Sequence, residues 1–271
     1  MIYVWVILVM LIIATGYKHI EHRLIFKPTR SHTTTPEKEG LVFEEVLLPT
    51  SDGLQLHGWW FPHPEAIGTI LHCHGNAENI SDRLWLPEDL KRIPVNLLMF
   101  DYRGFGISPG RSSARGSYLD TFAAYDFIRS KHPGETVPPI VVLGQSLGGG
   151  IACELAINRP VKGLVLESTY TSIVQMGRRY YPWLLPDLLC GHRFDCISKV
   201  SRITVPKLFA HSPVDETIPF DMGETLFAAA AEPKRWFQLE GEHGEESLRQ
   251  SPGYHDVFRD FVIDALSTDH A

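Results

Sequence analysis

From Gly40 onward, this 271-residue chain alternates between short apolar runs typical of strands and longer apolar patterns typical of helices. Leu41–Leu48 and Leu54–Phe61 flank the turn residues Ser51, Asp52 and Gly53, which predicts a hairpin. Further strands are predicted at Thr69–His74, Val95–Phe100, Ile140–Leu143, Gly163–Glu167, Lys207–His211 and Arg235–Glu240. Helices are predicted at Glu78–Arg92, with Pro87 interrupting it, and at Tyr118–Lys131, Ser146–Asn158 and Tyr254–Leu266. This alternation predicts an α/β fold: a mainly parallel central sheet with helices on both faces, entered through an antiparallel hairpin.

The N-terminal stretch MIYVWVILVMLIIATGY, residues 1–17, carries no charged side chain. Seventeen helical residues at ~1.5 Å each span about 25 Å, near the lower limit for crossing a bilayer. The nearest basic residues, Lys18, Arg23, Lys27 and Arg30, all follow this stretch. We therefore predict one transmembrane helix at 1–17, with the rest of the chain in the cytoplasm by the positive-inside rule. A signal peptide cleaved near Gly16 is the alternative. Residues 18–39 are predicted to link the anchor to a single domain at 40–271.

Composition narrows the possible classes of protein. Hydrophobic residues make up 44% of the chain and charged residues 21%, as in ordinary globular proteins. A net charge of −7 argues against nucleic-acid binding, which needs a basic surface. The four cysteines show no C-x-x-C spacing, and no H-E-x-x-H motif occurs. We expect no metal and no cofactor, and we expect Cys190 and Cys196 to stay reduced in a cytoplasmic domain.

Candidate chemistry begins at a serine between a predicted strand and a predicted helix. Residues 144–148 read Gly-Gln-Ser-Leu-Gly, the G-x-S-x-G pattern, with Ser146 at its centre. The pattern alone is a weak signal. Its position between an apolar strand and an apolar helix is typical of a nucleophile elbow, which exposes the serine hydroxyl at a sharp turn. The alternative is a glycine-rich turn with an incidental serine.

A serine nucleophile needs a base, and the base needs an orienting carboxylate. On this architecture the expected chain order is serine, acid, histidine. Asp215 follows the predicted strand Lys207–His211, and His243 follows the strand Arg235–Glu240. The competing acid is Glu167, at the end of an earlier strand. The competing base is His255, within the predicted final helix.

An oxyanion hole requires one N–H after the nucleophile and another from the loop after the third strand. Leu147 supplies the first. Asn76 or Ala77 supplies the second, because Gly75 lets that loop turn tightly.

With these motifs the chain resembles the α/β-hydrolase superfamily, and within it the small membrane-anchored Bem46-like and protein-depalmitoylase-like serine hydrolases. The matching stretches run from Gly40 to the C-terminus: HGNAENI, DYRGFGISPG, GQSLGG, LESTYTS, VDETIPF and GEHG. The resemblance implies an α/β-hydrolase fold with Ser146 as nucleophile, Asp215 as acid and His243 as base. The chain departs from the family pattern at Glu78, where a glycine is usual, and in GEHGEE, which lacks the small residues that often precede the histidine.

Residues 168–205 lie between two predicted strands, where this fold carries its cap. They include RRYYPWLLPDLL, Arg178–Leu189, which is rich in aromatic residues and leucines. We expect a small cap that lines an acyl pocket or touches lipid. The alternative is a connecting helix that simply packs on the sheet.

Together these features predict a serine hydrolase that cleaves ester or thioester bonds of small-molecule or lipid-like acyl substrates at a membrane. A peptidase of the prolyl-oligopeptidase type shares the G-x-S-x-G-G elbow and is one alternative. A non-catalytic, membrane-anchored scaffold is another. The acyl preference depends on analogy and on the apolar cap, because fold does not fix substrate.

Overall fold

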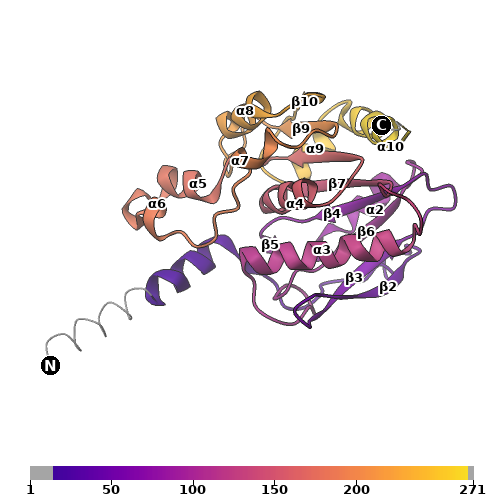
Figure 1. Cartoon of the computed structure of the whole chain (residues 1–271), viewed down its shortest axis with the longest axis horizontal. Helices are drawn as coiled ribbons and strands as arrows, with labels where there is room; N and C mark the ends of the chain where they lie inside the picture. The colour runs from indigo at the N-terminus through magenta and orange to yellow at the C-terminus, as the bar shows by residue number, and fades with distance from the viewer. Residues whose placement is uncertain (1–14, 268–271) are drawn as a thin grey trace, which may run out of the picture.

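The computed structural model describes residues 15–267. At its centre is an eight-stranded sheet in the order β10-β9-β8-β7-β4-β6-β3-β2 (Figure 1). Its strands are β2 Glu44–Pro49, β3 Gln55–Phe61, β4 Thr69–Cys73, β6 Asn96–Phe100, β7 Ile140–Gln145, β8 Gly163–Glu167, β9 Lys207–His211 and β10 Lys234–Gln238. The β2–β3 and β3–β6 pairs are antiparallel, and the other neighbours are parallel. The predicted parallel sheet with an entering hairpin is therefore confirmed.

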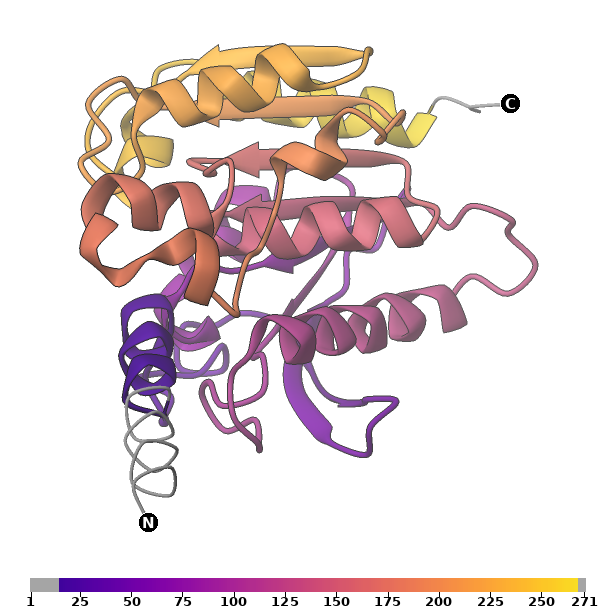
Figure 2. The same ribbon diagram turned by 60° about the vertical axis from the view of Figure 1, so that its left-hand side comes forward.

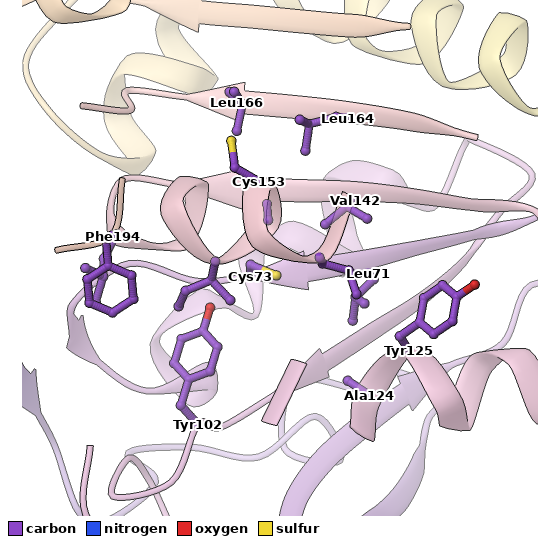
Figure 3. Close-up of a cluster of buried hydrophobic side chains, with 14 of the residues drawn as sticks. Leu71, Cys73, Tyr102, Ala124, Tyr125, Val142, Cys153, Leu164, Leu166 and Phe194 are labelled. Atoms are coloured by element: carbon purple, nitrogen blue, oxygen red, sulfur yellow. The ribbon is translucent and has the colours of Figure 1, made fainter. Parts of the chain in front are cut away.

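Helices cover both faces of the sheet. One face packs against α3 Ala114–Ser130, α4 Leu147–Asn158, α7 Ile197–Val200 and α8 Phe220–Ala229. The other packs against α2 Trp85–Leu90, α9 Glu245–Gln250 and α10 Tyr254–Ser267. Within β4, Leu71 belongs to the first core cluster and Ile70 to the second, because successive strand residues point to opposite faces. Figure 3 shows part of the first cluster, with side chains of β4, β7 and β8 facing those of α3 and α4.

The helix predicted at Glu78–Arg92 with an interruption at Pro87 is wrong, except over α2. The chain forms a short strand β5, Ala77–Glu78, then a 3₁₀ turn at Ile80–Arg83, and only then α2. Glu78 adopts a left-handed backbone with φ of 62°, and Asn79 caps the 3₁₀ turn through its side chain. Helix-forming residues cannot continue a helix through a left-handed residue. Pro87 is tolerated because it lies in the first turn of α2.

The N-terminal segment packs against the domain. Residues 15–25 are helical, and β1, Lys27–Pro28, pairs in parallel with β5. Residues 18–28 of the predicted linker are thus folded structure. No helix within 15–267 is long and apolar enough to cross a membrane. The predicted anchor lies outside the described residues except for 15–17.

The segment between β8 and β9 forms α5 Ile173–Tyr180, a 3₁₀ turn at Pro182–Leu184, α6 Pro186–Leu189 and then α7. The first three project beside the N-terminal helix at one end of the sheet, as the two views of Figures 1 and 2 show. We call residues 173–189 the cap. The later part of the predicted cap belongs to the core instead, since Cys196, Val200 and Ile203 are buried there. All four cysteines are buried and free.

Candidate active site

Ser146 lies at the sharp turn between β7 and α4, with φ of 52° and ψ of −118°. A positive φ is strained for a residue with a Cβ, and such strain is often found at functional positions. The flanking glycines allow the turn to pack tightly. A Cβ on Gly148 would lie 1.8 Å from the carbonyl oxygen of Cys73, and a Cβ on Gly144 would lie 2.7 Å from the Cα of Gly149. The serine thus occupies an elbow that only glycine neighbours permit.

The structure brings together the three residues that the sequence placed on separate loops. His243 Nε2 lies 3.1 Å from Ser146 Oγ, and His243 Nδ1 lies 2.7 Å from Asp215 Oδ2. Asp215 follows β9 and His243 follows β10, two neighbouring strands whose carboxyl ends lie at the same edge of the sheet. The Asp215 side chain is 0% exposed and that of His243 is 18% exposed. This is the geometry in which an imidazole can accept the serine proton.

Asp215 is held as an anion. Burial alone would raise the pKa of this carboxyl, but hydrogen bonds from His211 and His243 lower it well below its usual range. The backbone N–H groups of Thr217 and Ile218 donate to its other oxygen at 2.9 and 2.7 Å. A buried carboxylate with this many donors stays ionised and can orient the imidazole.

Two neighbours of these residues were not identified from the sequence. His211 Nε2 lies 3.4 Å from Asp215 Oδ2 and is almost completely buried. Glu216 Oε2 accepts the backbone N–H of His243 at 2.8 Å, which holds the histidine loop in place. Both residues lie in the stretch HSPVDE, residues 211–216. Their closeness to Asp215 along the chain was the sequence feature that could have identified them.

The competing acid and base lie elsewhere. Glu167 is fully buried beneath the elbow, where it accepts hydrogen bonds from the Tyr254 hydroxyl and from Gln145 Nε2. Burial raises the pKa of Glu167 to about 7. His255 is exposed on α10 and lines neither of the cavities beside Ser146. Although Glu167 borders one of these cavities, the carboxylate that is hydrogen-bonded to the His243 imidazole is that of Asp215.

The backbone donors predicted for an oxyanion hole flank the serine. Leu147 is the first residue of α4, so its N–H has no partner within the helix. The His74–Asn79 loop lies on the other side: a Cβ on Gly75 would be 3.6 Å from Ser146 Cβ. Asn76 borders both cavities that reach Ser146, whereas Ala77 borders only one of them.

Ser146 opens onto two cavities of different character. The first, of about 300 Å³, has mainly apolar walls from the N-terminal helix and the cap, including Leu24, Ile25, Ile173, Met176, Tyr180, Tyr181 and Leu184. The second, of about 200 Å³, is lined by the charged residues Asp82, Arg83, Glu167 and Glu245, and also by Trp85 and Leu248. A substrate whose scissile bond lies at Ser146 could therefore extend into both cavities, with more charged side chains around the smaller one.

Among residues 15–267, one cluster has donor atoms spaced as in a metal site: His32, His57 and Asp101, all within 4.8 Å of one another. His32 Nε2 and Asp101 Oδ2 are joined directly by a hydrogen bond of 2.8 Å. None of the three lines either cavity. This contact fastens residue 32 to the end of β6, which accounts for the cluster without an ion.

A serine at an elbow, a histidine beside it and a buried aspartate behind the histidine, on this sheet order, define the α/β-hydrolase class. Residues 64–192 match the family described as serine aminopeptidase, S33. The chain is 32% identical to the α/β-hydrolase domain-containing protein WAV2 of Arabidopsis thaliana, over 78% of this chain and 76% of that one. It is 26% identical to protein bem46 of Schizosaccharomyces pombe, over 93% and 89%. The chain belongs to the α/β-hydrolase superfamily and resembles its Bem46-like members.

Its fold is similar to that of solved esterases. The Pyrococcus furiosus esterase Pf2001 superposes with a TM-score of 0.74, covering 89% of this chain and 100% of that one at 18% identity. This similarity shows the α/β-hydrolase fold.

Proposed function

We propose that the protein is a serine hydrolase that cleaves carboxylic ester or thioester bonds of acyl substrates through an acyl-enzyme on Ser146. The observation that carries the proposal is the distance of 3.1 Å between His243 Nε2 and Ser146 Oγ, at a serine that opens onto a largely apolar cavity. A hydroxyl in this position is activated by the imidazole when an acyl carbonyl approaches.

In the proposed mechanism, Ser146 Oγ attacks the acyl carbon while its proton moves to His243 Nε2. The N–H groups of Leu147 and Asn76 stabilise the resulting oxyanion. The tetrahedral intermediate collapses, and His243 returns the proton to the leaving alcohol or thiol. Water then loses a proton to His243, attacks the acyl carbon and releases the carboxylic acid, with the proton restored to Ser146. Throughout, Asp215 stabilises the imidazolium without taking up a proton.

The two cavities divide the substrate between them in this proposal. The acyl chain occupies the apolar cavity between the cap and the N-terminal helix, because burial of methylene groups there is favourable. The leaving group occupies the smaller, charged cavity beside Arg83 and Glu245. A cavity of about 300 Å³ is at the lower end of the range for small-molecule sites.

The proposal includes attachment to a membrane through residues 1–17, with the catalytic domain in the cytoplasm. The support is the uncharged stretch followed by Lys18, Arg23, Lys27 and Arg30. A second support is the exposed apolar surface of the cap, where Trp183 is 71% and Leu188 is 78% exposed. A lipid-like substrate would then approach from the bilayer.

Ser146→Ala tests the proposal through labelling by a fluorophosphonate probe and hydrolysis of p-nitrophenyl esters. We expect both to disappear, whereas Ser130→Ala, which alters a serine at the end of α3 distant from the elbow, keeps them. Labelling that persists in Ser146→Ala would identify another nucleophile. A wild type that cleaves amino-acid p-nitroanilides and no ester would favour a peptidase. A wild type without labelling or turnover would favour a scaffold.

A further inference from the structure

One face of the N-terminal helix lies against the active site. Tyr17, Glu21, Leu24 and Ile25 all line the apolar cavity that reaches Ser146. Their spacing is i, i+4, i+7 and i+8, which places them on a single face of a helix. Opposite them, the cavity is walled by residues of the cap such as Met176 and Leu184. This helix, residues 15–25, begins within the predicted anchor, and it forms a wall of the cavity as well as a connection to the domain.

Hydrogen bonds fasten this segment to both sides of the site. Glu21 Oε1 accepts the backbone N–H groups of Gly191 and His192, just after the cap, at 2.7 and 2.9 Å. At the other end, Asn76 Nδ2 donates to the carbonyl oxygen of Ile25 at 3.0 Å. The Lys27 N–H donates to the carbonyl oxygen of Asn76 at 2.8 Å.

These contacts hold the N-terminal helix in place beside the cavity. Glu21 is buried, and its carboxylate accepts hydrogen bonds from two backbone N–H groups that follow the cap. Hydrogen bonds to a charged acceptor are stronger than those between neutral groups. The β1–β5 pairing attaches the segment to the same loop that contributes Asn76 to the proposed oxyanion hole. A side chain that projects from this helix into the cavity therefore takes space from whatever the cavity holds.

We propose that residues 17–25 select the acyl chain of the substrate, with Leu24 as the side chain that limits chain length. This inference depends on the proposed hydrolysis at Ser146 and assigns its specificity to a segment outside the usual cap. Leu24 is apolar, lines the cavity and is 37% exposed, so its volume can change without opening the protein core. A larger side chain there shortens the space for the acyl chain, and a smaller one lengthens it.

Ile20 provides a matched control on the same helix. It is also apolar and 48% exposed, but it does not line the cavity. Substitutions at Ile20 therefore alter an exposed apolar position of the same helix without altering a residue that lines the cavity.

The experiment measures kcat/KM of the full-length protein for p-nitrophenyl esters from acetate to palmitate. Leu24→Trp is expected to lower the ratio of long-chain to short-chain kcat/KM by about tenfold or more, because a lost methylene contact in an apolar pocket has an effect of about this size. Leu24→Ala is expected to shift the preferred chain toward greater length. Ile20→Trp keeps the wild-type ratio.

Opposite shifts from the two Leu24 variants support the inference, since a purely structural role would lower all rates together. If Leu24→Trp does not fold, the direction of the Leu24→Ala shift decides alone. An unchanged chain-length profile in both variants of an active enzyme, or an equal shift in Ile20→Trp, overturns the inference and leaves the hydrolase proposal intact. A wild type that hydrolyses no ester overturns both.

Discussion

Asp215 Oδ2 lies 2.7 Å from His243 Nδ1, and it is the more deeply buried member of the pair. The carboxylate therefore fixes both the orientation of the imidazole and the nitrogen that carries the proton. That leaves Nε2 free to accept a proton from Ser146.

Asp215→Asn is expected to reduce turnover by on the order of 10⁴, because the imidazole loses its favoured tautomer. Glu167→Gln is the matched control, since it removes the other carboxylate near the elbow. We expect Glu167→Gln to retain activity within about tenfold, as its partners are Tyr254 and Gln145 rather than His243. The turnover number of each purified variant on the same p-nitrophenyl ester measures both effects. A larger loss in Glu167→Gln than in Asp215→Asn would assign the acid to β8.

His243→Ala is expected to remove nearly all turnover, by about 10⁴ or more. His255→Ala, on the exposed side of α10, should keep most of it. Steady-state kinetics on the same ester distinguishes the two. Retained activity in His243→Ala would exclude this histidine as the general base.

Gly148→Ala tests the packing of the elbow. The new Cβ would meet the carbonyl oxygen of Cys73 at 1.8 Å, so strand or helix must shift, at a cost of about 1–3 kcal/mol or more. Gly191→Ala is the control, because the nearest heavy atom to its Cβ would be 3.6 Å away. In Gly148→Ala, the free energy of unfolding measured in urea and the rate of fluorophosphonate labelling should both be lower than in wild type. In Gly191→Ala, both should be unchanged. Equal stability of the two variants would show that the elbow can accommodate a methyl group at residue 148.

The raised pKa of Glu167 predicts that the stability of the protein depends on pH. The pKa of this buried carboxyl is raised to about 7 from a usual value of 4.5, so the folded state binds more protons than the unfolded chain between these values. The contribution of Glu167 is therefore most favourable below pH 4.5, and it declines as pH rises to 7. Glu167→Gln imitates the protonated acid. The free energy of unfolding of this variant relative to wild type should therefore increase across this pH range, by roughly 2–3 kcal/mol. Urea unfolding at several pH values measures it, and a constant difference would contradict the shift.

The proposed topology predicts that protease added to intact cells leaves the catalytic domain uncut, while cell lysis exposes it. Lys18, Arg23, Lys27 and Arg30 are the residues expected to retain the domain in the cytoplasm. A mature chain that begins near Tyr17, or a domain that is cut in intact cells, would reverse the assignment.

The buried parallel strands were the easiest part of the fold to predict. The structure confirms Gly163–Glu167 and Lys207–His211 to the residue, because each is a short apolar run buried on both faces. The Glu78–Arg92 helix failed for a local reason, the left-handed backbone at Glu78, which composition does not reveal. The helices α8 and α9 were not anticipated either.

The candidate site was predictable as far as chain order and strand ends could place it. Ser146, Asp215 and His243 come together because parallel strands end at one edge. The contribution of residues 17–25 was not foreseen, although Tyr17, Glu21, Leu24 and Ile25 share a helix face in the printed sequence. A spacing shows which residues share a face, but it does not show what that face packs against.

The two cavities at Ser146 share Asn76 and Ser146, but most of their other lining residues come from different stretches of the chain. The larger one is lined mainly by the N-terminal helix, the insertion between β8 and β9 and the loop after β9. The smaller one is lined mainly by the stretch from Gly75 to Trp85, the ends of β7 and β8 and the loop after β10. Mutations that alter one half of the substrate site can therefore accumulate without disturbing the other. After gene duplication, descendants of such a chain could exchange acyl preference and leaving-group preference independently, while natural selection preserved the shared elbow between them.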